Sequence, residues 1–199
     1  MAQVENKYGI RGTYYFRTKT SVFRTDIIQK ISQLGHEIGY HYETLAECRG
    51  NYKDAMALFI KELNMFREIC RVTSISMHGR PLSKYDNRDL WQKYDFLDHE
   101  LYGECYLSID YNHVLYLSDT GRTWHPTRYN VRDKVSGQTL PELETTDELI
   151  QFIGAGMNKP LCLLTHPNRW TDSPLIWGKE WLLDQCVNRI KEVLIWVRR

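Results

Sequence analysis

Three short apolar runs in this sequence are each closed by a histidine, and this feature constrains the fold more than any other. Each run has the length of a strand and is flanked by glycine, proline or polar residues. Side chains that follow the carboxyl ends of parallel strands line the active face of many α/β enzymes. The runs cover residues 36–41, 72–77 and 160–165, and the histidines are His41, His78 and His166. The sequence therefore predicts an α/β enzyme whose chemistry lies at strand ends.

Helical patterns alternate with these strands. In residues 52–69, apolar side chains recur at three- and four-residue steps, and Asn51 is placed to cap that helix. Thr145 and Glu148 have the spacing of a capping box, which predicts the start of a second helix. From Trp177 the chain has a helical pattern to its end, and we expect its apolar side to be buried.

Further strands are expected at residues 12–16, 101–109 and 114–117. The run at 160–165 is apolar almost throughout, as in strands covered on both faces, and we expect Cys162 to be a core residue. Strands that alternate with helices favour a mostly parallel sheet or a barrel. With 199 residues, the chain is long enough for a full core, so we expect a single domain over residues 1–199.

Composition limits the kinds of partner. Hydrophobic residues make up 42% of the chain and charged residues 26%, which is typical of a globular protein. A formal net charge of +1 without a basic block argues against a nucleic-acid surface, and no apolar run has the ~20 residues of a membrane span. The five cysteines are widely spaced, which indicates free thiols, and the N-terminus has no apolar signal core. We therefore expect a cytoplasmic protein with no nucleic-acid or membrane partner.

His41 and the residues after it suit a metal site. Neutral imidazole is the commonest protein ligand for zinc, and a carboxylate such as that of Glu43 is a regular companion. His78 ends another strand and would form a polar pair with Arg80 at the active face. The alternative for His41 is a structural hydrogen bond at a strand end. His36 lies five residues before His41, so on an extended strand it faces the opposite side, and we expect it to be structural.

Other candidates also follow strands. Arg80 has the fork-shaped guanidinium that orients a carboxylate, or it is a solvated residue of a turn. A buried pair of Asp119 with Arg122 would support a site, and Trp124 would form a wall for a sugar; the alternative is a surface ion pair and a core tryptophan. His166 has an imidazole suited to general acid catalysis near neutral pH, or it has no titrating role.

Together these phrases resemble the polysaccharide deacetylase family, the NodB-like carbohydrate esterases of family 4. The most specific match is Gly35-His-Glu-Ile-Gly-Tyr-His41, because that family has a near-identical phrase after a helix. Three further segments are similar to its arginine loop, its Asp-and-Trp loop and its closing strand, namely Arg80-Pro81, Asp119 to Trp124 and Leu163-Leu-Thr-His166. The sequence around the three histidines is similar to that of a branch of the family found with surface-polysaccharide and O-antigen biosynthesis proteins.

The resemblance implies a distorted (β/α) barrel, a divalent metal that is usually zinc, and hydrolysis of the acetyl group of an amino sugar. By position, His41 matches the first metal histidine, His166 the catalytic acid and Arg80 the arginine that orients the base. The second metal histidine would stand at Leu45, so Glu43 or His78 is the expected substitute. The expected partner is accordingly an acetylated sugar or glycan.

The resemblance also implies a gap at the start of the barrel. The first strand of the family, which ends in paired aspartates, would precede Tyr8, where residues 1–7 contain neither an aspartate nor a strand. Either the chain is a truncated copy or that strand comes from elsewhere. A barrel that lacks its first strand exposes an edge, which predicts association into a homo-oligomer. We expect weak or absent turnover, because the site then has no positioned base.

Three functions follow as hypotheses. The first is metal-dependent deacetylation of an N-acetylated sugar in surface-polysaccharide metabolism. The second is a non-catalytic glycan-binding protein that keeps a deacetylase-like fold. The third is another metal-dependent hydrolase that uses His41, Glu43, His78 and His166 as its own ligands.

Overall fold

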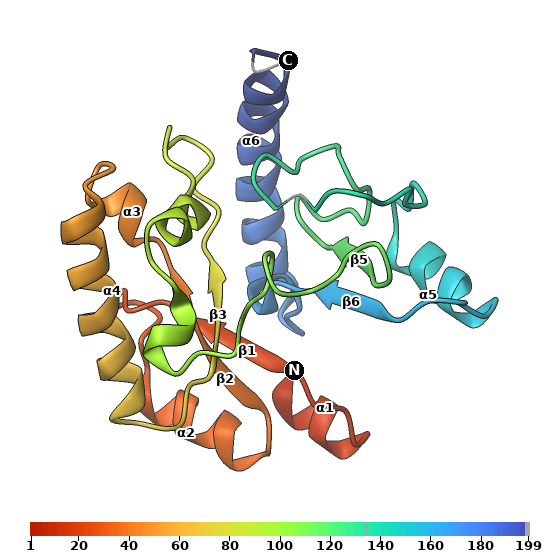
Figure 1. Cartoon of the computed structure of the whole chain (residues 1–199). Helices are drawn as coiled ribbons and strands as arrows, with labels where there is room; N and C mark the ends of the chain where they lie inside the picture. The colour runs from red at the N-terminus through yellow and green to blue at the C-terminus, as the bar shows by residue number, and fades with distance from the viewer. Residues whose placement is uncertain (134, 198–199) are drawn as a thin grey trace. The chain divides into compact units, whose positions relative to one another are not determined.

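The computed structural model describes residues 1–133 and 135–197 and shows a mixed α/β protein with parallel strands (Figure 1). The expected α/β class is therefore confirmed. We expected one domain over residues 1–199, and the chain divides into two compact units, Met1–Ile109 and Asp110–Arg199. We call these parts unit 1 and unit 2.

Unit 1 has the predicted alternation of helices and strands. Its elements in chain order are α1 (Ala2–Lys7), β1 (Thr13–Phe16), α2 (Thr25–Gln33), β2 (Glu37–Tyr42), α3 (Thr44–Glu47), α4 (Tyr52–Arg67), β3 (Ser74–Met77), the 3₁₀ helices η1 (Asn87–Gln92) and η2 (Phe96–His99), and β4 (Gly103–Glu104). The strands predicted near residues 12–16, 36–41 and 72–77 are thus confirmed as β1, β2 and β3.

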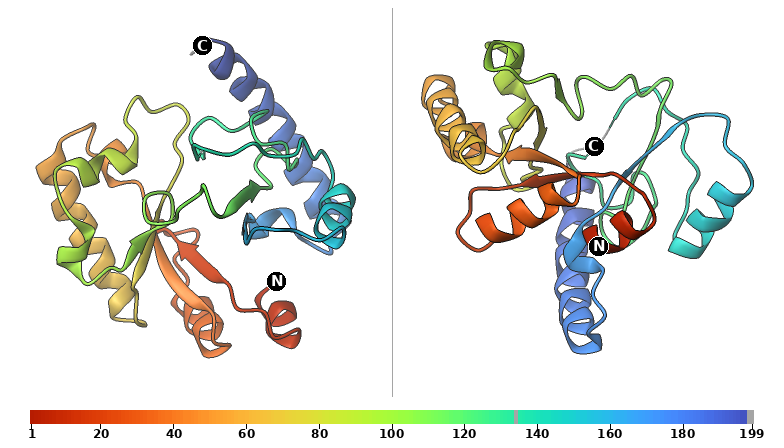
Figure 2. Two further views of the ribbon diagram at one scale, coloured as in Figure 1. Left: turned by 45° about the vertical axis from the view of Figure 1, so that its right-hand side comes forward. Right: turned by 90° about the horizontal axis from the view of Figure 1, so that it is seen from below.

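The four strands form one parallel sheet in the order β1-β2-β3-β4, and Figure 2 shows β1, β2 and β3 side by side. Thr13 pairs with Glu37 where β1 and β2 begin, and Tyr42 pairs with Met77 where β2 and β3 end. The Glu37 carboxylate accepts hydrogen bonds from the hydroxyls of Thr13 (2.7 Å) and Ser74 (2.7 Å), one on each neighbouring strand. This bridge fixes the register of the three strands at their amino ends.

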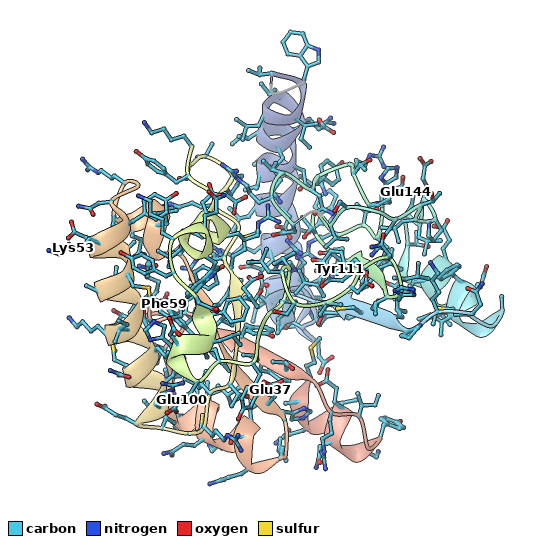
Figure 3. All side chains as sticks on the ribbon, in the orientation of Figure 1. Glu37, Lys53, Phe59, Glu100, Tyr111 and Glu144 are labelled. Carbon is cyan, nitrogen blue, oxygen red and sulfur yellow. The ribbon has the colours of Figure 1, made fainter. Side chains whose placement is uncertain are left out.

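The core of unit 1 is aromatic and lies where α4 packs on the sheet. Asn51 caps α4 as predicted, because its side chain accepts a hydrogen bond from the backbone N–H of Lys53 (3.1 Å). Phe59 is fully buried, and its ring centroid lies 5.3 Å from that of Tyr40 and 4.9 Å from that of Trp91. Figure 3 shows Phe59 pointing into this unit and Lys53 pointing out of it.

The strand predicted at residues 101–109 is wrong except for the two residues of β4. Glu104 ends the strand. Its fully buried carboxylate accepts hydrogen bonds from backbone N–H groups that would otherwise pair with a neighbouring strand. It accepts from the N–H groups of Tyr106 (2.7 Å) and Leu107 (3.0 Å), so the chain turns there. It also accepts from the N–H of Met77 (2.8 Å) and thereby holds the end of β3. Burial raises the pKa of Glu104 in spite of these hydrogen bonds.

Unit 2 is built on a two-stranded parallel sheet. Its elements are β5 (Leu115–Ser118), α5 (Thr146–Gly154), β6 (Leu161–Leu164), the 3₁₀ helix η3 (Pro167–Arg169) and α6 (Pro174–Val197). The capping box of α5 is confirmed, since the Thr145 side chain accepts from the N–H of Glu148 and the Glu148 side chain accepts from the N–H of Thr145.

The core of unit 2 is small and centres on Leu117, Trp124 and Leu149. β6 is not covered on both faces as expected: Leu163 is 42% exposed and Cys162 is only partly buried. A two-stranded sheet with one small core leaves a face of β6 without cover, which the apolar sequence alone did not indicate.

The helix predicted after Trp177 is confirmed as α6, but its apolar side is not buried. Leu182, Val193 and Val197, which were expected on the buried side, are 61%, 60% and 67% exposed. The buried residue of α6 is instead Asn188, which donates a hydrogen bond to the carbonyl oxygen of Gly121 (3.0 Å). Periodicity located the helix, but it did not identify the side that packs. Among the described residues, no helix combines the length and apolar character needed to cross a membrane.

Candidate functional site

The parallel register of unit 1 brings two histidines together where β2 and β3 end. His41 in β2 pairs with Ser76 in β3, and His78 directly follows β3. His41 Nδ1 lies 2.9 Å from the carbonyl oxygen of Ser76 and donates to it, which fixes the ring. The ring centroids of His41 and His78 lie 5.0 Å apart in an edge-to-face arrangement. Both histidines therefore lie where the strand pattern predicted them.

Glu43 is the anionic centre of this cluster. Its carboxylate is 9% exposed, lies 2.8 Å from His78 Nδ1, and has Arg17 Nη1 at 3.9 Å and Lys19 Nζ at 3.4 Å. Burial acts to raise the pKa of Glu43, but the hydrogen bond and charge of His78, followed by a hydrogen bond from Glu47 and the charge of Arg17, outweigh it. The net result is a pKa far below the usual range, so Glu43 stays ionised near neutral pH.

These contacts do not fit a metal site. Both ring nitrogens of His78 already face partners, since Nδ1 contacts Glu43 and Nε2 lies 3.0 Å from Arg17 Nη1. A divalent ion on His78 and Glu43 would be repelled by Arg17, while the charge of Lys19 is already paired with the carboxylate of Glu47. Within residues 1–133 and 135–197, no group of three or more His, Cys, Asp or Glu side chains is arranged to hold a metal ion. The zinc expected on His41, Glu43 and His78 stays a prediction that these contacts do not support.

In unit 2, the ends of β5 and β6 bring Asp119 and His166 together. Ser118 pairs with Leu164, and the backbone N–H of Asp119 donates to the carbonyl oxygen of Leu164 (3.1 Å). His166 Nδ1 lies 2.5 Å from Asp119 Oδ1, and the backbone N–H of His166 donates to Asp119 Oδ2 (3.0 Å). One carboxylate therefore orients both the ring and the backbone of His166. We call Asp119 and His166 the dyad.

Two residues that follow His166 complete the surroundings of Asp119. Arg169 Nη1 donates to Asp119 Oδ1 (2.9 Å), and Trp170 Nε1 donates to Asp119 Oδ2 (3.0 Å). Burial acts to raise the pKa of Asp119, but the hydrogen bond and charge of His166 and the charge of Arg169 lower it to a net value below the usual range. The Asp119 side chain is 6% exposed and that of His166 38% exposed. The carboxylate is thus ionised and fixed, while the imidazole is accessible.

Arg122 belongs to this site with a different partner from the one predicted. We expected it to pair with Asp119, but Arg122 Nε donates to Asp184 on α6 (2.7 Å). Arg169 is the arginine on Asp119, and its Nε also reaches Asp184 (3.3 Å). The backbone is left-handed at both Gly121 (φ 78°) and Arg122 (φ 61°), and this tight turn separates the Arg122 side chain from that of Asp119.

Two other predicted residues lie outside these contacts. Arg80 is exposed, and its side chain makes no hydrogen bond or ion pair with the described residues. Arg17, which follows β1, is the arginine that contacts the His78 cluster. Trp124 is 4% exposed and lies in the core of unit 2, where its Nε1 donates to Thr146 (3.2 Å). For Trp124, the structure shows the alternative of a core tryptophan and not a sugar-facing wall.

Unit 2 contains a second His–Asp pair that serves as a comparison for the dyad. His113 Nδ1 lies 2.7 Å from Asp110 Oδ2, but the two side chains are 83% and 57% exposed. An ion pair in that setting contributes little, because water and salt screen it. Burial and the added donors, and not the short distance, therefore distinguish Asp119 and His166.

The sequence contained signals for the residues that pattern reasoning missed. Arg17 and Lys19 follow the end of β1, as the predicted candidates follow other strands. Arg169 and Trp170 stand in the phrase Thr165-His-Pro-Asn-Arg-Trp170, directly after the predicted acid. Asp184 carries no such signal, because only the packing of α6 brings it to Arg122.

Comparisons of this chain with protein-family models, with curated proteins and with solved structures found no match.

Proposed function

We propose that this chain is a hydrolase of the deacetylase type that acts on an N-acetylated sugar in surface-polysaccharide metabolism, with the dyad as its proton-transfer unit. The observation that carries the proposal is the buried Asp119 carboxylate on Nδ1 of an accessible His166. The sequence phrases that resemble polysaccharide deacetylases supply the substrate class. The distorted (β/α) barrel is part of the same proposal.

The dyad suits the step in which an amine must leave. Water adds to the acetyl carbonyl carbon and loses a proton to the solvent; the C–N bond then breaks, its electron pair goes to the nitrogen, and the nitrogen takes a proton from the His166 imidazolium, which the solvent protonates again. Acetate and the free amino sugar are the products. Asp119 holds the ring through Nδ1 and stabilises the imidazolium, which leaves Nε2 to face the substrate. His166 and the charge of Arg169 together keep Asp119 ionised, and Arg169 Nη1 lies 2.8 Å from His166 Nδ1.

The contacts of unit 1 favour a second candidate, a non-catalytic glycan-binding protein. Glu43 and His78 are bound to each other and flanked by Arg17 and Lys19, so this cluster offers no free base for the attacking water. No step is assigned to a divalent ion for the same reason. A zinc-dependent hydrolase that uses His41, Glu43 and His78 would release acetate only when zinc is added. The acetate-release assay described next therefore tests it as well.

The test is acetate release from N-acetylglucosamine oligosaccharides by the full chain, with and without added zinc. We expect slow release that falls about 100-fold or more in His166→Asn, the size of a typical general-acid effect. Asp119→Asn is expected to reduce the rate as well, because the ring loses its anchor and its counter-charge. Circular dichroism at the assay temperature confirms that each variant is folded.

The matched control is His113→Asn, which makes the same change in the exposed His–Asp pair of the same unit. Its rate should equal that of the unchanged chain. Release that is equal in His166→Asn and His113→Asn would refute the role of the dyad. No acetate above the protein-free blank, with or without zinc, would refute hydrolysis and favour the glycan-binding candidate.

A further inference from the structure

Trp170 is an exposed aromatic residue that is bonded directly to the dyad. Its Nε1 donates to Asp119 Oδ2 (3.0 Å), and the residue is nevertheless 43% exposed. Because the edge of the indole that carries Nε1 is turned to the carboxylate, the side chain presents ring carbons to solvent. Trp170 is therefore anchored through one polar atom and open over an apolar surface.

The turn after β6 holds His166 and Trp170 at a fixed spacing. The two residues flank η3, in which the backbone N–H of Arg169 donates to the carbonyl oxygen of His166 (3.0 Å) and the N–H of Trp170 donates to that of Pro167 (3.1 Å). The ring of Pro167 also restricts the backbone at the start of this turn. A side chain that is already held in place loses little conformational entropy when a ligand covers it.

The Asp119 carboxylate has no place left for a ligand. His166 Nδ1 and Arg169 Nη1 lie at hydrogen-bond distance from Oδ1, and the backbone N–H of His166 and Trp170 Nε1 donate to Oδ2. The Asp119 side chain is 6% exposed, whereas that of His166 is 38% exposed. The groups that this site presents to solvent are therefore the imidazole of His166 and the indole of Trp170.

A sugar residue suits this pair of side chains. The faces of a pyranose ring carry C–H groups that can pack on an aromatic ring, and its hydroxyl and acetamido groups project from the rim. Since the imidazole and the indole are bonded to the same carboxylate, a single sugar residue that lies on Trp170 is within reach of His166. Trp124 cannot take this role, because it is 4% exposed.

We propose that Trp170 is the side chain on which a sugar ring of an N-acetylated glycan stacks, next to His166. This inference rests on the proposed deacetylation for its substrate class, and it names the residue that positions that substrate. Three other tryptophans are at least 40% exposed, but they lie on α6 and have no hydrogen bond to the dyad among the described residues; they are Trp177, Trp181 and Trp196.

The experiment is a saturation-transfer NMR titration of the full chain with the N-acetylglucosamine trimer as probe. We expect saturable binding, with the strongest transfer to C–H protons of a sugar ring. Trp170→Ala should raise the Kd about tenfold, the effect of losing ~50 Å² of apolar contact. Trp170→Phe keeps an aromatic face but loses the N–H donor, and its Kd should stay within about threefold of that of the unchanged chain. Circular dichroism confirms that each variant is folded.

Trp196→Ala is the matched control, because it removes an exposed tryptophan of the same unit. It should bind the trimer as the unchanged chain does. Absence of saturable binding, or an unchanged Kd in Trp170→Ala, would overturn the proposal. An equal loss in Trp170→Ala and Trp170→Phe would also overturn it, since the N–H anchor and not the ring would then account for binding.

His166→Asn separates this inference from the proposed hydrolysis. It should abolish acetate release and leave the Kd for the trimer unchanged. If no variant or unchanged chain releases acetate but binding still depends on the ring of Trp170, hydrolysis is refuted and stacking on Trp170 is supported. If acetate is released but Trp170→Ala binds the trimer as well as the unchanged chain, stacking is refuted and hydrolysis is not.

Discussion

The two units place similar His–carboxylate pairs at strand ends but surround them differently. In unit 1, Glu43 shares its charge between His78 and two cationic side chains that follow β1. In unit 2, Arg169 and Trp170 donate to the Asp119 carboxylate, and Arg169 Nη1 also lies 2.8 Å from His166 Nδ1. Both imidazoles therefore have an arginine beside them, but it meets Nε2 of His78 and Nδ1 of His166, and His166 Nε2 has no hydrogen-bond partner among the described residues.

The cores beneath the two pairs differ as well. Unit 1 packs an aromatic core in which large side chains such as Tyr40, Tyr42 and Phe59 are fully buried. Unit 2 has a core centred on three buried residues and depends more on polar contacts, including those of Asp184 and Asn188 on α6. Apolar burial is the main stabilising contribution in the first unit, and specific hydrogen bonds and ion pairs have a larger share in the second.

The largest expected effect tests this difference between cores. Phe59→Ala should lower the free energy of unfolding by about 4 kcal/mol, because it leaves a cavity among aromatic rings. Leu182→Ala on the exposed side of α6 should change it by less than about 0.5 kcal/mol. Urea unfolding followed by circular dichroism measures both. A large loss in Leu182→Ala would show that the apolar side of α6 is covered in solution.

The second prediction concerns the polar support of unit 2. Asp119→Asn should lower the free energy of unfolding by about 3 kcal/mol at neutral pH, because it breaks a buried ion pair. The folded-state pKa of Asp119 is depressed, so its contribution is complete above the unfolded-state pKa and is lost as pH falls through the folded value. Urea midpoints measured from neutral to acid pH should therefore converge between variant and unchanged chain.

The control for this pH series is Asp110→Asn, which alters the exposed His–Asp pair. It should not change the midpoint measurably at neutral pH. A difference between Asp119→Asn and the unchanged chain that stays constant, or grows, towards acid pH would contradict the depressed pKa of Asp119.

The smallest effects come from the two helix caps, one in each unit. Asn51→Ala in unit 1 and Thr145→Ala in unit 2 should each cost about 1 kcal/mol, because each removes a side-chain acceptor from a helix start. Thermal unfolding by calorimetry measures both. If the units unfold separately, each variant shifts one of two transitions; equal shifts of one shared transition would show that they unfold together.

Local patterns predicted much of this fold. The strands before His41, His78 and His166 and both helix caps could be predicted because period, glycine and capping spacing act within about ten residues. The partners of Asp119 and Arg122 could not be predicted, because they depend on a left-handed turn and on a helix more than sixty residues away. The buried side of α6 was assigned wrongly because periodicity does not show what covers a face.

The sequence by itself determined that parallel strands deliver histidines to their carboxyl ends, since strand length and flanking residues are local properties. Tertiary structure decided what each histidine meets there: Arg17 and Glu43 for His78, and a buried Asp119 for His166. The chemistry of an imidazole is set by the charges and donors within a few ångströms of it, and packing brings those groups from distant parts of the chain.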